Sequence, residues 1–189
     1  MHKVIAITGL CGAGKTTAAL HMKEKGYQYL RFGQIVIDVL KEQNQPVTPE
    51  NEKRIRNALR QTHGMEAFAL ANAPKISIWH QKGNIVIDGL YSFAEYKVLK
   101  EQFADTFITL AIYAPPELRY KRLSQRHASP DDDKILFRPL TPKEAMNRDY
   151  DEIENADKGG PIAMADWTIV NTKTRVDLEN EIKEFLWQI

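Results

Sequence analysis

The stretch GLCGAGKT, residues 9 to 16, constrains the fold of this chain more than any other feature. It directly follows the apolar run VIAIT and precedes a segment with helical periodicity. An ordinary turn needs about one glycine, whereas this stretch has three, followed at once by Lys15 and Thr16. A backbone so rich in glycine can adopt the left-handed angles that aim successive N–H groups into one concavity. The stretch therefore predicts a loop that is shaped around a ligand where the first strand ends.

The spacing of the fixed residues in this loop indicates a phosphate ligand. The stretch matches the pattern G-x-x-x-x-G-K-[ST] at every fixed position, which are Gly9, Gly14, Lys15 and Thr16. The helix that follows adds unpaired N–H groups and the positive end of its dipole. A chance glycine-rich turn is the alternative, but strand, loop and helix occur here in the required order. The residues expected to bind ATP through this loop are Gly9, Gly12, Ala13, Gly14, Lys15, Thr16 and Thr17.

Three residues near this loop have distinct chemical tasks. Lys15 can reach the terminal phosphates as a point charge, and the Thr16 hydroxyl can bind Mg²⁺. Asp88 ends the apolar run IVID, and in phosphate-loop proteins an acid at the end of a neighbouring strand holds Mg²⁺ directly or through water. An Asp–Gly turn is the alternative, but a buried strand rarely ends in a charge without a partner. We therefore expect ATP and Mg²⁺ as cofactors, with Thr16 and Asp88 at the metal and Asp88 as a catalytic candidate.

Strand-like and helix-like segments alternate along the chain. The expected strands are 4–8, 27–31, 84–89, 107–113 and 167–171. The expected helices are 15–25, 33–43, two within 49–82, 92–103, 115–127, 142–156 and one that begins near Val176, with a turn at KGGP before the last strand. Such alternation implies right-handed crossovers and a parallel sheet that is covered on both faces. The sequence thus predicts an α/β fold of the P-loop NTPase type, with a five-stranded parallel sheet and with ligands beyond the carboxyl ends of the strands.

A row of arginines follows the fourth expected strand. Arg119, Arg122 and Arg126 recur at i, i+3 and i+7, which places them on one face of a helix. A transferring phosphoryl group spreads charge over its oxygens, and planar guanidinium groups stabilise that charge. A solvated basic face is the alternative for such a row. We expect these three arginines to be catalytic, and Arg138 and Arg148 are further candidates for the same role.

A second group of arginines lies in the first half of the chain. Arg31 ends the second expected strand, and Arg56 and Arg60 are one helical turn apart. Together they could clamp an acceptor phosphate, although each alone could be an ordinary surface residue. Gly89, next to Asp88, would let a substrate approach the backbone closely. We therefore expect the acceptor to bind at Arg31, Arg56, Arg60 and Gly89.

The length of 189 residues fits one domain over 1–189 with a substantial core. Within it, a helical insertion at about 32–82 would bind the acceptor, and a segment at about 117–150 would form a lid. That segment contains a polar, proline-interrupted loop, residues 128–141, after the arginine helix.

Composition excludes several classes of function. Lys and Arg number 26 against 25 Asp and Glu, so no global charge favours nucleic acid or a membrane as a partner. Cys11 is the one cysteine, which excludes an internal disulfide. We expect Cys11 to be in the loop because it is small enough to fit there. Redox control is the less favoured alternative, because no resolving cysteine exists. Without a signal peptide or a long apolar run, we expect a cytoplasmic protein, and its oligomeric state stays open.

Four stretches, taken together and in order, resemble the small P-loop kinases of nucleotides. These are GLCGAGKTTAA, IVIDGL, APPELRYKRLSQR and ADWTIVN before a final helix. Within that family the chain is similar to the dephospho-CoA kinase-like group, which includes proteins related to adenylate kinase. The stretch A-D-x-x-I-x-N, Ala165 to Asn171, narrows the family. The resemblance implies that Asn171 and the residues after it lie near the adenine of ATP, and that the helix 117–126 supplies lid arginines.

Two departures from this family bear on the substrate. Dephospho-CoA kinases usually carry a D-x-D-like acidic pair just after the second strand, whereas Gly33 and Gln34 stand there in this chain. Tyr91 and Ser92 follow the Asp–Gly pair, where the proteins related to adenylate kinase tend to have an arginine. At the first of these positions the chain is more similar to nucleoside-monophosphate kinases, in which arginines face an acceptor phosphate. The resemblance therefore implies the reaction class more firmly than the substrate.

The residues and the resemblance together predict ATP-dependent phosphoryl transfer to a small nucleotide-like acceptor. A nucleoside or deoxynucleoside monophosphate is the first acceptor, and dephospho-CoA is the alternative. A regulatory switch that hydrolyses ATP slowly is an alternative from another class, but the expected lid favours transfer. A phosphate-loop module that only binds nucleotide is the third alternative, which intact Lys15, Thr16 and Asp88 disfavour.

Overall fold

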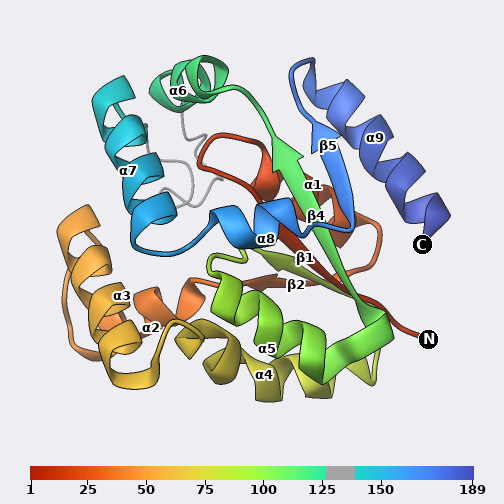
Figure 1. Ribbon diagram of the computed structural model, residues 1–189, viewed down its shortest axis with the longest axis horizontal. Helices are drawn as coiled ribbons and strands as arrows, with labels where there is room; N and C mark the ends of the chain where they lie inside the picture. The colour runs from red at the N-terminus through yellow and green to blue at the C-terminus, as the bar shows by residue number, and fades with distance from the viewer. Residues whose placement is uncertain (127–138) are drawn as a thin grey trace.

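A parallel β-sheet lies at the centre of the protein (Figure 1). The computed structural model describes residues 1–126 and 139–189, and within them the sheet has five strands in the order β2-β3-β1-β4-β5. The strands are β1 (Val4–Thr8), β2 (Gln28–Arg31), β3 (Ile85–Asp88), β4 (Phe107–Tyr113) and β5 (Trp167–Val170). Every neighbouring pair is parallel. The predicted five-stranded parallel sheet is therefore confirmed.

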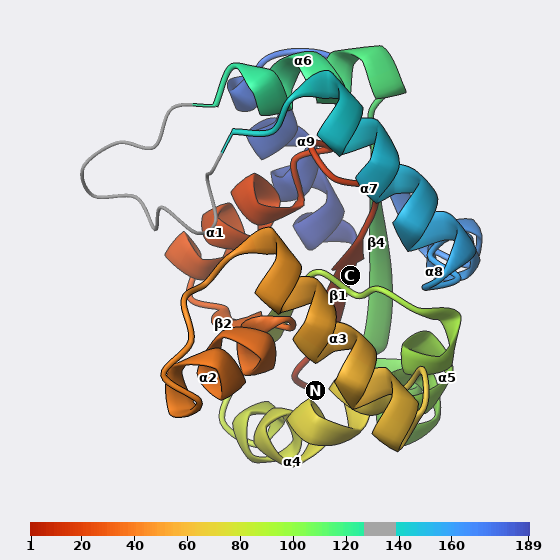
Figure 2. The same ribbon diagram turned by 90° about the vertical axis from the view of Figure 1, so that its left-hand side faces the viewer.

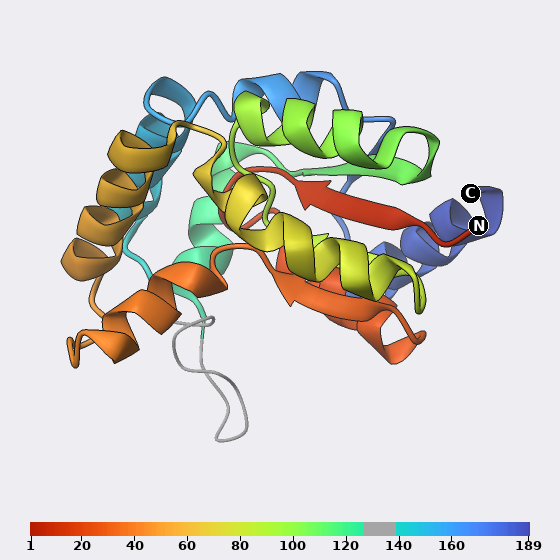
Figure 3. The ribbon, with the colours of Figure 1, turned by 90° about the horizontal axis from the view of Figure 1, so that it is seen from below.

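Helices cover both faces of this sheet because its central strand is apolar on both sides. Val4 and Ala6 of β1 belong to one hydrophobic cluster, and Ile5 and Ile7 belong to the other. The first cluster lies under α4 (Ala67–His80) and α5 (Phe93–Phe103), which run along the strands in Figure 3. The second lies under α1 (Lys15–Glu24) and α9 (Arg175–Gln188). The alternation of side chains along a buried strand thus fixes the two helical layers.

Other helices gather near the carboxyl edge of the sheet. They are α2 (Gln34–Glu42), α3 (Pro49–His63), α6 (Pro116–Ser124) and α7 (Pro142–Glu154). The short helix α8 (Gly159–Ala163) packs against α5, and the 3₁₀ turn η1 (Ala104–Thr106) precedes β4. Figure 2 shows α3 and α7 side by side, and an ion pair of 3.1 Å between Lys53 and Asp151 joins them. Among the described residues, no helix has both the length and the apolarity that a membrane span requires.

Local capping signals explain where several helices begin. Ser92, Thr141 and Thr174 each accept a hydrogen bond from the backbone N–H three residues later, in a capping box with an acidic residue. The sequence was less informative at KGGP, where we expected a turn and the structure forms α8. Gly160 explains the packing there, because a Cβ on it would lie 2.6 Å from Cβ of Phe93 in α5. A glycine therefore lets this short helix lie directly against α5.

Candidate active site

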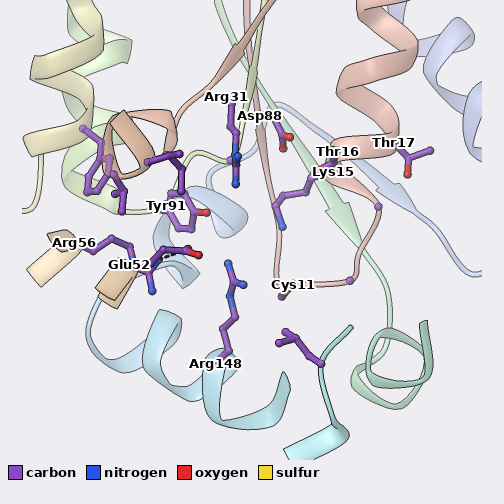
Figure 4. A pocket seen from close by; sticks show the side chains of 18 of the residues that line it. Cys11, Lys15, Thr16, Thr17, Arg31, Glu52, Arg56, Asp88, Tyr91 and Arg148 are labelled. Carbon is purple, nitrogen blue, oxygen red and sulfur yellow. Dashed lines mark hydrogen bonds and ion pairs between the residues drawn. The ribbon is translucent and has the colours of Figure 1, made fainter. Parts of the chain in front are cut away.

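A cleft opens at the carboxyl edge of the sheet, where the phosphate loop faces α3 and α7 (Figure 4). Three neighbouring strands deliver residues to it, since β1 leads into the loop, β3 ends at Asp88 and β2 ends at Arg31. Strand register places Asp88 level with both Ile7 and Arg31. The structure therefore brings most of the predicted residues together. Those that line the cleft are Gly12, Gly14, Lys15, Thr16, Thr17, Arg31, Arg56, Arg60, Asp88, Gly89, Arg126 and Arg148.

The phosphate loop owes its shape to glycines in the left-handed region. Gly9 has φ of 134°, and a Cβ on it would lie 2.3 Å from the Ile112 carbonyl oxygen. Gly14 has φ of 109°, and a Cβ there would lie 2.4 Å from Nδ2 of Asn171. α1 begins directly after Gly14, so the unpaired amides of its first turn adjoin the cleft. The Lys15 ammonium donates a hydrogen bond of 3.0 Å to the Leu10 carbonyl, at the opposite end of the loop.

Arg119 supports this loop from behind and does not line the cleft. Its side chain is 2% exposed and forms an ion pair of 2.6 Å with Asp149 of α7. It also donates hydrogen bonds to the carbonyls of Cys11, at 3.0 Å, and Ala114, at 2.9 Å. Arg119 thus ties the loop to β4 and α7, because the first turn of α6 packs against the loop. The sequence alone suggested a phosphate contact for this residue.

Arg122 and Asn171 also connect segments around the phosphate loop. Arg122 donates to the carbonyls of Asn171, at 2.9 Å, and Lys173, at 3.4 Å, and it does not line the cleft. Asn171 in turn donates from Nδ2 to the Ala13 carbonyl at 2.8 Å. A second hollow lies at the carboxyl end of β5 and includes Asn171 and Lys173. This hollow is where the family resemblance would place adenine, so that assignment stays a prediction.

Arg126, two residues beyond the end of α6, and Arg148 of α7 reach the cleft. Arg126 lines the cleft, and burial lowers its pKa. Arg148 also lines it and donates from Nε to Glu152 Oε1 at 2.9 Å. Arg138 and residues 127–138 of the predicted lid lie outside the described residues. The three arginines were predicted on one helix, but α6 ends at Ser124, so Arg126 lies beyond it. Of the three, Arg126 lines the cleft.

The protein interior beside Lys15 carries an excess of positive charge. Lys158 is fully buried, with Nζ 3.0 Å from Glu152 Oε2. Burial, and then the Lys158 ammonium, lower the pKa of Lys15. Although burial by itself raises the pKa of Glu152, the charges of Lys158, Arg148 and Lys15 hold it well below its usual value. One carboxylate thus faces three cations, an arrangement that favours a bound anion.

Thr16 and Asp88 fit the chemistry of Mg²⁺ bound to a nucleotide. Asp88 is buried, and its Oδ2 accepts a hydrogen bond of 3.0 Å from the Tyr29 hydroxyl. Both residues line the cleft, and Mg²⁺ prefers one or two carboxylates, water and phosphate oxygens to a full protein cage. Accordingly, in the part of the chain that the structure describes, no group of three or more His, Cys, Asp or Glu could hold a metal.

The opposite end of the cleft combines arginines with an apolar wall. Arg56 forms an ion pair of 3.2 Å with Glu52, and the Arg60 guanidinium lies 5.6 Å from the centre of the Phe68 ring. Val36 and Ile37 of α2 line the same end. Sequence reasoning found the arginines but missed the other four, because apolar residues and a helical acid are typical of any helix surface.

The sequence analysis also missed Tyr91, which lines the cleft, and Lys158, which is buried beside it. Tyr91 lines the cleft three residues after Asp88, so its place beyond the end of β3 was a usable signal. Lys158 follows α7 at a position that was read as a turn, and nothing local marks it as buried. Cys11 is the free thiol of the described chain, lines the cleft and packs with Leu123 and Ala145.

Solved structures define the class of this fold. The shikimate kinase of Bacteroides thetaiotaomicron superposes with a TM-score of 0.64 at 14% identity, over 99% of each chain. The shikimate kinase of Aquifex aeolicus does so with a TM-score of 0.57 at 17% identity, over 98% of this chain and 96% of that one. At such identities the likeness concerns the fold alone. The fold is that of a P-loop kinase, which confirms the fold class predicted from the sequence.

Sequence relatives define the family. The family described as "AAA domain" matches residues 5–155. The UPF0200/UPF0201 protein of Archaeoglobus fulgidus is 32% identical over 99% of this chain, which spans 56% of that relative's length. The UPF0200 protein of Sulfurisphaera tokodaii is 31% identical over 99% of this chain and 97% of its own length. The UPF0200 protein of Pyrococcus abyssi is also 31% identical, over 97% of each chain. The chain belongs to the UPF0200 family and to the AAA-domain family.

Proposed function

We propose that this protein transfers the terminal phosphoryl group of ATP to a small anionic acceptor. The observation that carries the proposal is that one cleft has a phosphate loop at one end, Arg56 and Arg60 at the other, and Arg31 between them (Figure 4). A phosphate loop alone suits any nucleotide-binding protein, whereas facing arginines suit a second anion. A nucleoside or deoxynucleoside monophosphate is the first acceptor that we propose.

The donor end would hold ATP and Mg²⁺. The loop amides and Lys15 bind the phosphates, while Thr16 and Asp88 bind Mg²⁺, directly or through water. The metal, when bound, neutralises charge on the phosphates. Arg126 and Arg148 reach the same cleft and stabilise the charge that spreads over the transferring group. Asn171 and Lys173 lie at the hollow that we assign to adenine.

The acceptor oxygen would attack the terminal phosphorus in line with the departing ADP oxygen. One P–O bond forms as the other breaks, and the proton of an attacking hydroxyl passes to Asp88 when the acceptor has one to lose. Gly89 lets the acceptor lie close to the backbone beside Asp88. The apolar wall of Val36, Ile37 and Phe68 would contact the body of the acceptor.

The whole chain, 1–189, would act as one kinase domain. The segment 32–82 supplies α2, α3 and α4 and thus the acceptor end of the cleft. The segment 117–150 supplies Arg126 and Arg148 and would act as a lid that excludes water from the reaction. Arg119 and Arg122, in the same segment, would hold the donor end in shape through the contacts described above.

ADP release with a panel of acceptors tests this proposal. Purified protein, ATP and Mg²⁺ are assayed with nucleoside and deoxynucleoside monophosphates, dephospho-CoA and shikimate, and ADP is measured through a coupled reaction. We expect at least one monophosphate to stimulate release, and we expect Arg56→Ala to reduce that stimulation. Stimulation by dephospho-CoA alone would change the acceptor but keep the reaction. Slow release that no acceptor alters would contradict phosphoryl transfer and favour a regulatory ATPase.

A further inference from the structure

Tyr91 occupies the boundary between the two ends of the cleft. It follows β3 in the sequence Asp88-Gly89-Leu90-Tyr91 and lines the cleft. In Figure 4 its hydroxyl points into the open centre, with Lys15 across from it and with Arg31 and Arg148 above and below it. A hydroxyl at this place lies where a phosphoryl group would pass from donor to acceptor.

Two contacts hold the Tyr91 ring in this orientation. The backbone N–H of Tyr91 donates a hydrogen bond of 3.0 Å to Glu95 Oε2, which fixes the main chain. The Lys158 ammonium lies 3.9 Å from the centre of the ring, within cation–π range. The ring is thus confined by its backbone and by one face.

Lys158 makes this confinement unusual. Its side chain is fully buried, and burial of an ammonium group is unfavourable unless partners compensate for the lost hydration. Its partners in the described chain are the Glu152 carboxylate and the Tyr91 ring. A ring that only completed a wall of the cleft would need no buried cation beneath it. The arrangement therefore points to a required orientation of the tyrosine.

The Tyr91 hydroxyl has no hydrogen-bond partner within residues 1–126 and 139–189. The hydroxyl of Tyr120, which is also partly buried, has such a partner, with a bond of 2.9 Å to Asp149. Burial is the main cause of the lowered pKa of Lys15, and Tyr91 is among the nearby groups that also act on it. The hydroxyl is therefore a fixed donor that faces a basic cleft and is available to a ligand.

We propose that the Tyr91 hydroxyl donates a hydrogen bond to a phosphoryl oxygen at the boundary between donor and acceptor. This proposal rests on the proposed function and names a contact that the arginines do not supply. A neutral donor adds direction without adding charge to a site that already holds several cations. The oxygen belongs either to the terminal phosphate of ATP or to the anion of the acceptor, and the two sources give different results in one experiment.

Calorimetry with Tyr91→Phe tests the contact without knowledge of the acceptor. The phenylalanine keeps the ring over Lys158 and removes the hydroxyl. The ligands are Mg·ADP, Mg·AMPPNP and inorganic phosphate added to the Mg·AMPPNP complex. We expect the affinity for Mg·ADP to be unchanged. Either Mg·AMPPNP or the added phosphate should bind about tenfold more weakly, since a hydrogen bond to a charged group is lost. Weaker AMPPNP binding assigns the contact to the terminal phosphate, and weaker phosphate binding assigns it to the acceptor anion.

Tyr150→Phe is the matched control, because Tyr150 lies on α7 with 56% of its surface exposed. It should bind all three ligands as the wild-type protein does. The proposal is overturned when Tyr91→Phe leaves the AMPPNP and phosphate constants unchanged, or when ADP affinity falls by the same factor. A wild-type protein that binds no nucleotide contradicts the proposed function instead, so the two failures are distinguishable.

Discussion

The two ends of the cleft are built in different ways. At the phosphate-loop end, buried polar groups have partners: Lys15 donates to Leu10, Asn171 donates to Ala13 and Arg119 donates to Cys11. At the opposite end, two neighbouring buried side-chain atoms of the described chain, Arg60 Nε and Glu95 Oε1, make no hydrogen bond. The donor end is thus complete within the protein, whereas the acceptor end holds polar groups whose hydrogen bonds are not made internally.

This difference separates two kinds of arginine. Arg119 is buried under the loop, where its charge and its hydrogen bonds are used inside the fold. Arg60 lines the cleft, with its guanidinium over Phe68. Loss of the first should damage stability, and loss of the second should damage binding. The predictions below test this division.

Replacement of Arg119 should have the largest effect. Arg119→Ala leaves the Asp149 carboxylate buried without its cation, and broken buried pairs typically lose about 3–5 kcal/mol. Urea unfolding measures this loss. Arg175→Ala is the control, because its pair with Glu179 is on the surface of α9 and should contribute little to stability. A loss below about 1 kcal/mol for Arg119→Ala would show that this arginine is not structural.

Replacement of Lys15 should affect catalysis instead of folding. Lys15→Ala removes the charge at the terminal phosphates, and we expect the rate to fall about a hundredfold or more. Its unfolding midpoint should stay close to that of the wild type. Lys25→Ala, just beyond the end of the same helix, is the control for loss of a surface lysine. Normal turnover by Lys15→Ala contradicts the assignment of the loop.

Ionisation of the buried Glu95 carboxyl group should make the free energy of unfolding depend on pH. Burial raises the pKa of Glu95 to about 7. The folded state therefore holds this proton more tightly than the unfolded chain, so stability falls as pH rises from about 4.5 to about 7. Relative to Glu95→Gln, the wild type should lose on the order of 2 kcal/mol between about pH 5 and pH 7.5. Unfolding curves that stay parallel over this range would show that Glu95 is ionised in the folded protein.

Arg60 should give the smallest effect and the most selective one. Arg60→Ala should raise the KM of the acceptor about tenfold, as for a lost charged hydrogen bond, and leave the KM of ATP within about twofold. Arg54→Ala is a matched control, since Arg54 lies on the same helix, is exposed and does not line the cleft. An unchanged acceptor constant for Arg60→Ala removes this residue from the site.

The phosphate-loop end could be predicted from sequence because its geometry is local. Gly9 to Thr16 are consecutive, and their backbone angles and the start of α1 follow from those residues alone. Most strands were predictable for a similar reason, since they are short and mainly apolar runs such as Ile85 to Asp88, whereas β2 reads QYLR. Helix starts at Ser92 and Thr174 have capping residues three positions apart.

The acceptor end could be predicted only in part because it depends on contacts between distant segments. The spacing of Arg119, Arg122 and Arg126 predicts that they share one face of a helix. It does not predict which of them the phosphate loop covers. Tyr91 and Lys158 are 67 positions apart, and their contact exists only because α8 packs on α5. No local pattern indicates that Lys158 is buried. Contacts between side chains that meet only through tertiary packing therefore could not be predicted from the sequence.

The central claim is that the loop after β1 binds the phosphates of a Mg-nucleotide, and calorimetry with Mg·AMPPNP tests it most directly. The wild-type protein should bind one nucleotide per chain. Gly14→Ala should bind it far more weakly, because the new Cβ meets Asn171 at a left-handed backbone position. Absence of heat with the wild-type protein, or equal affinity in Gly14→Ala, would contradict the account.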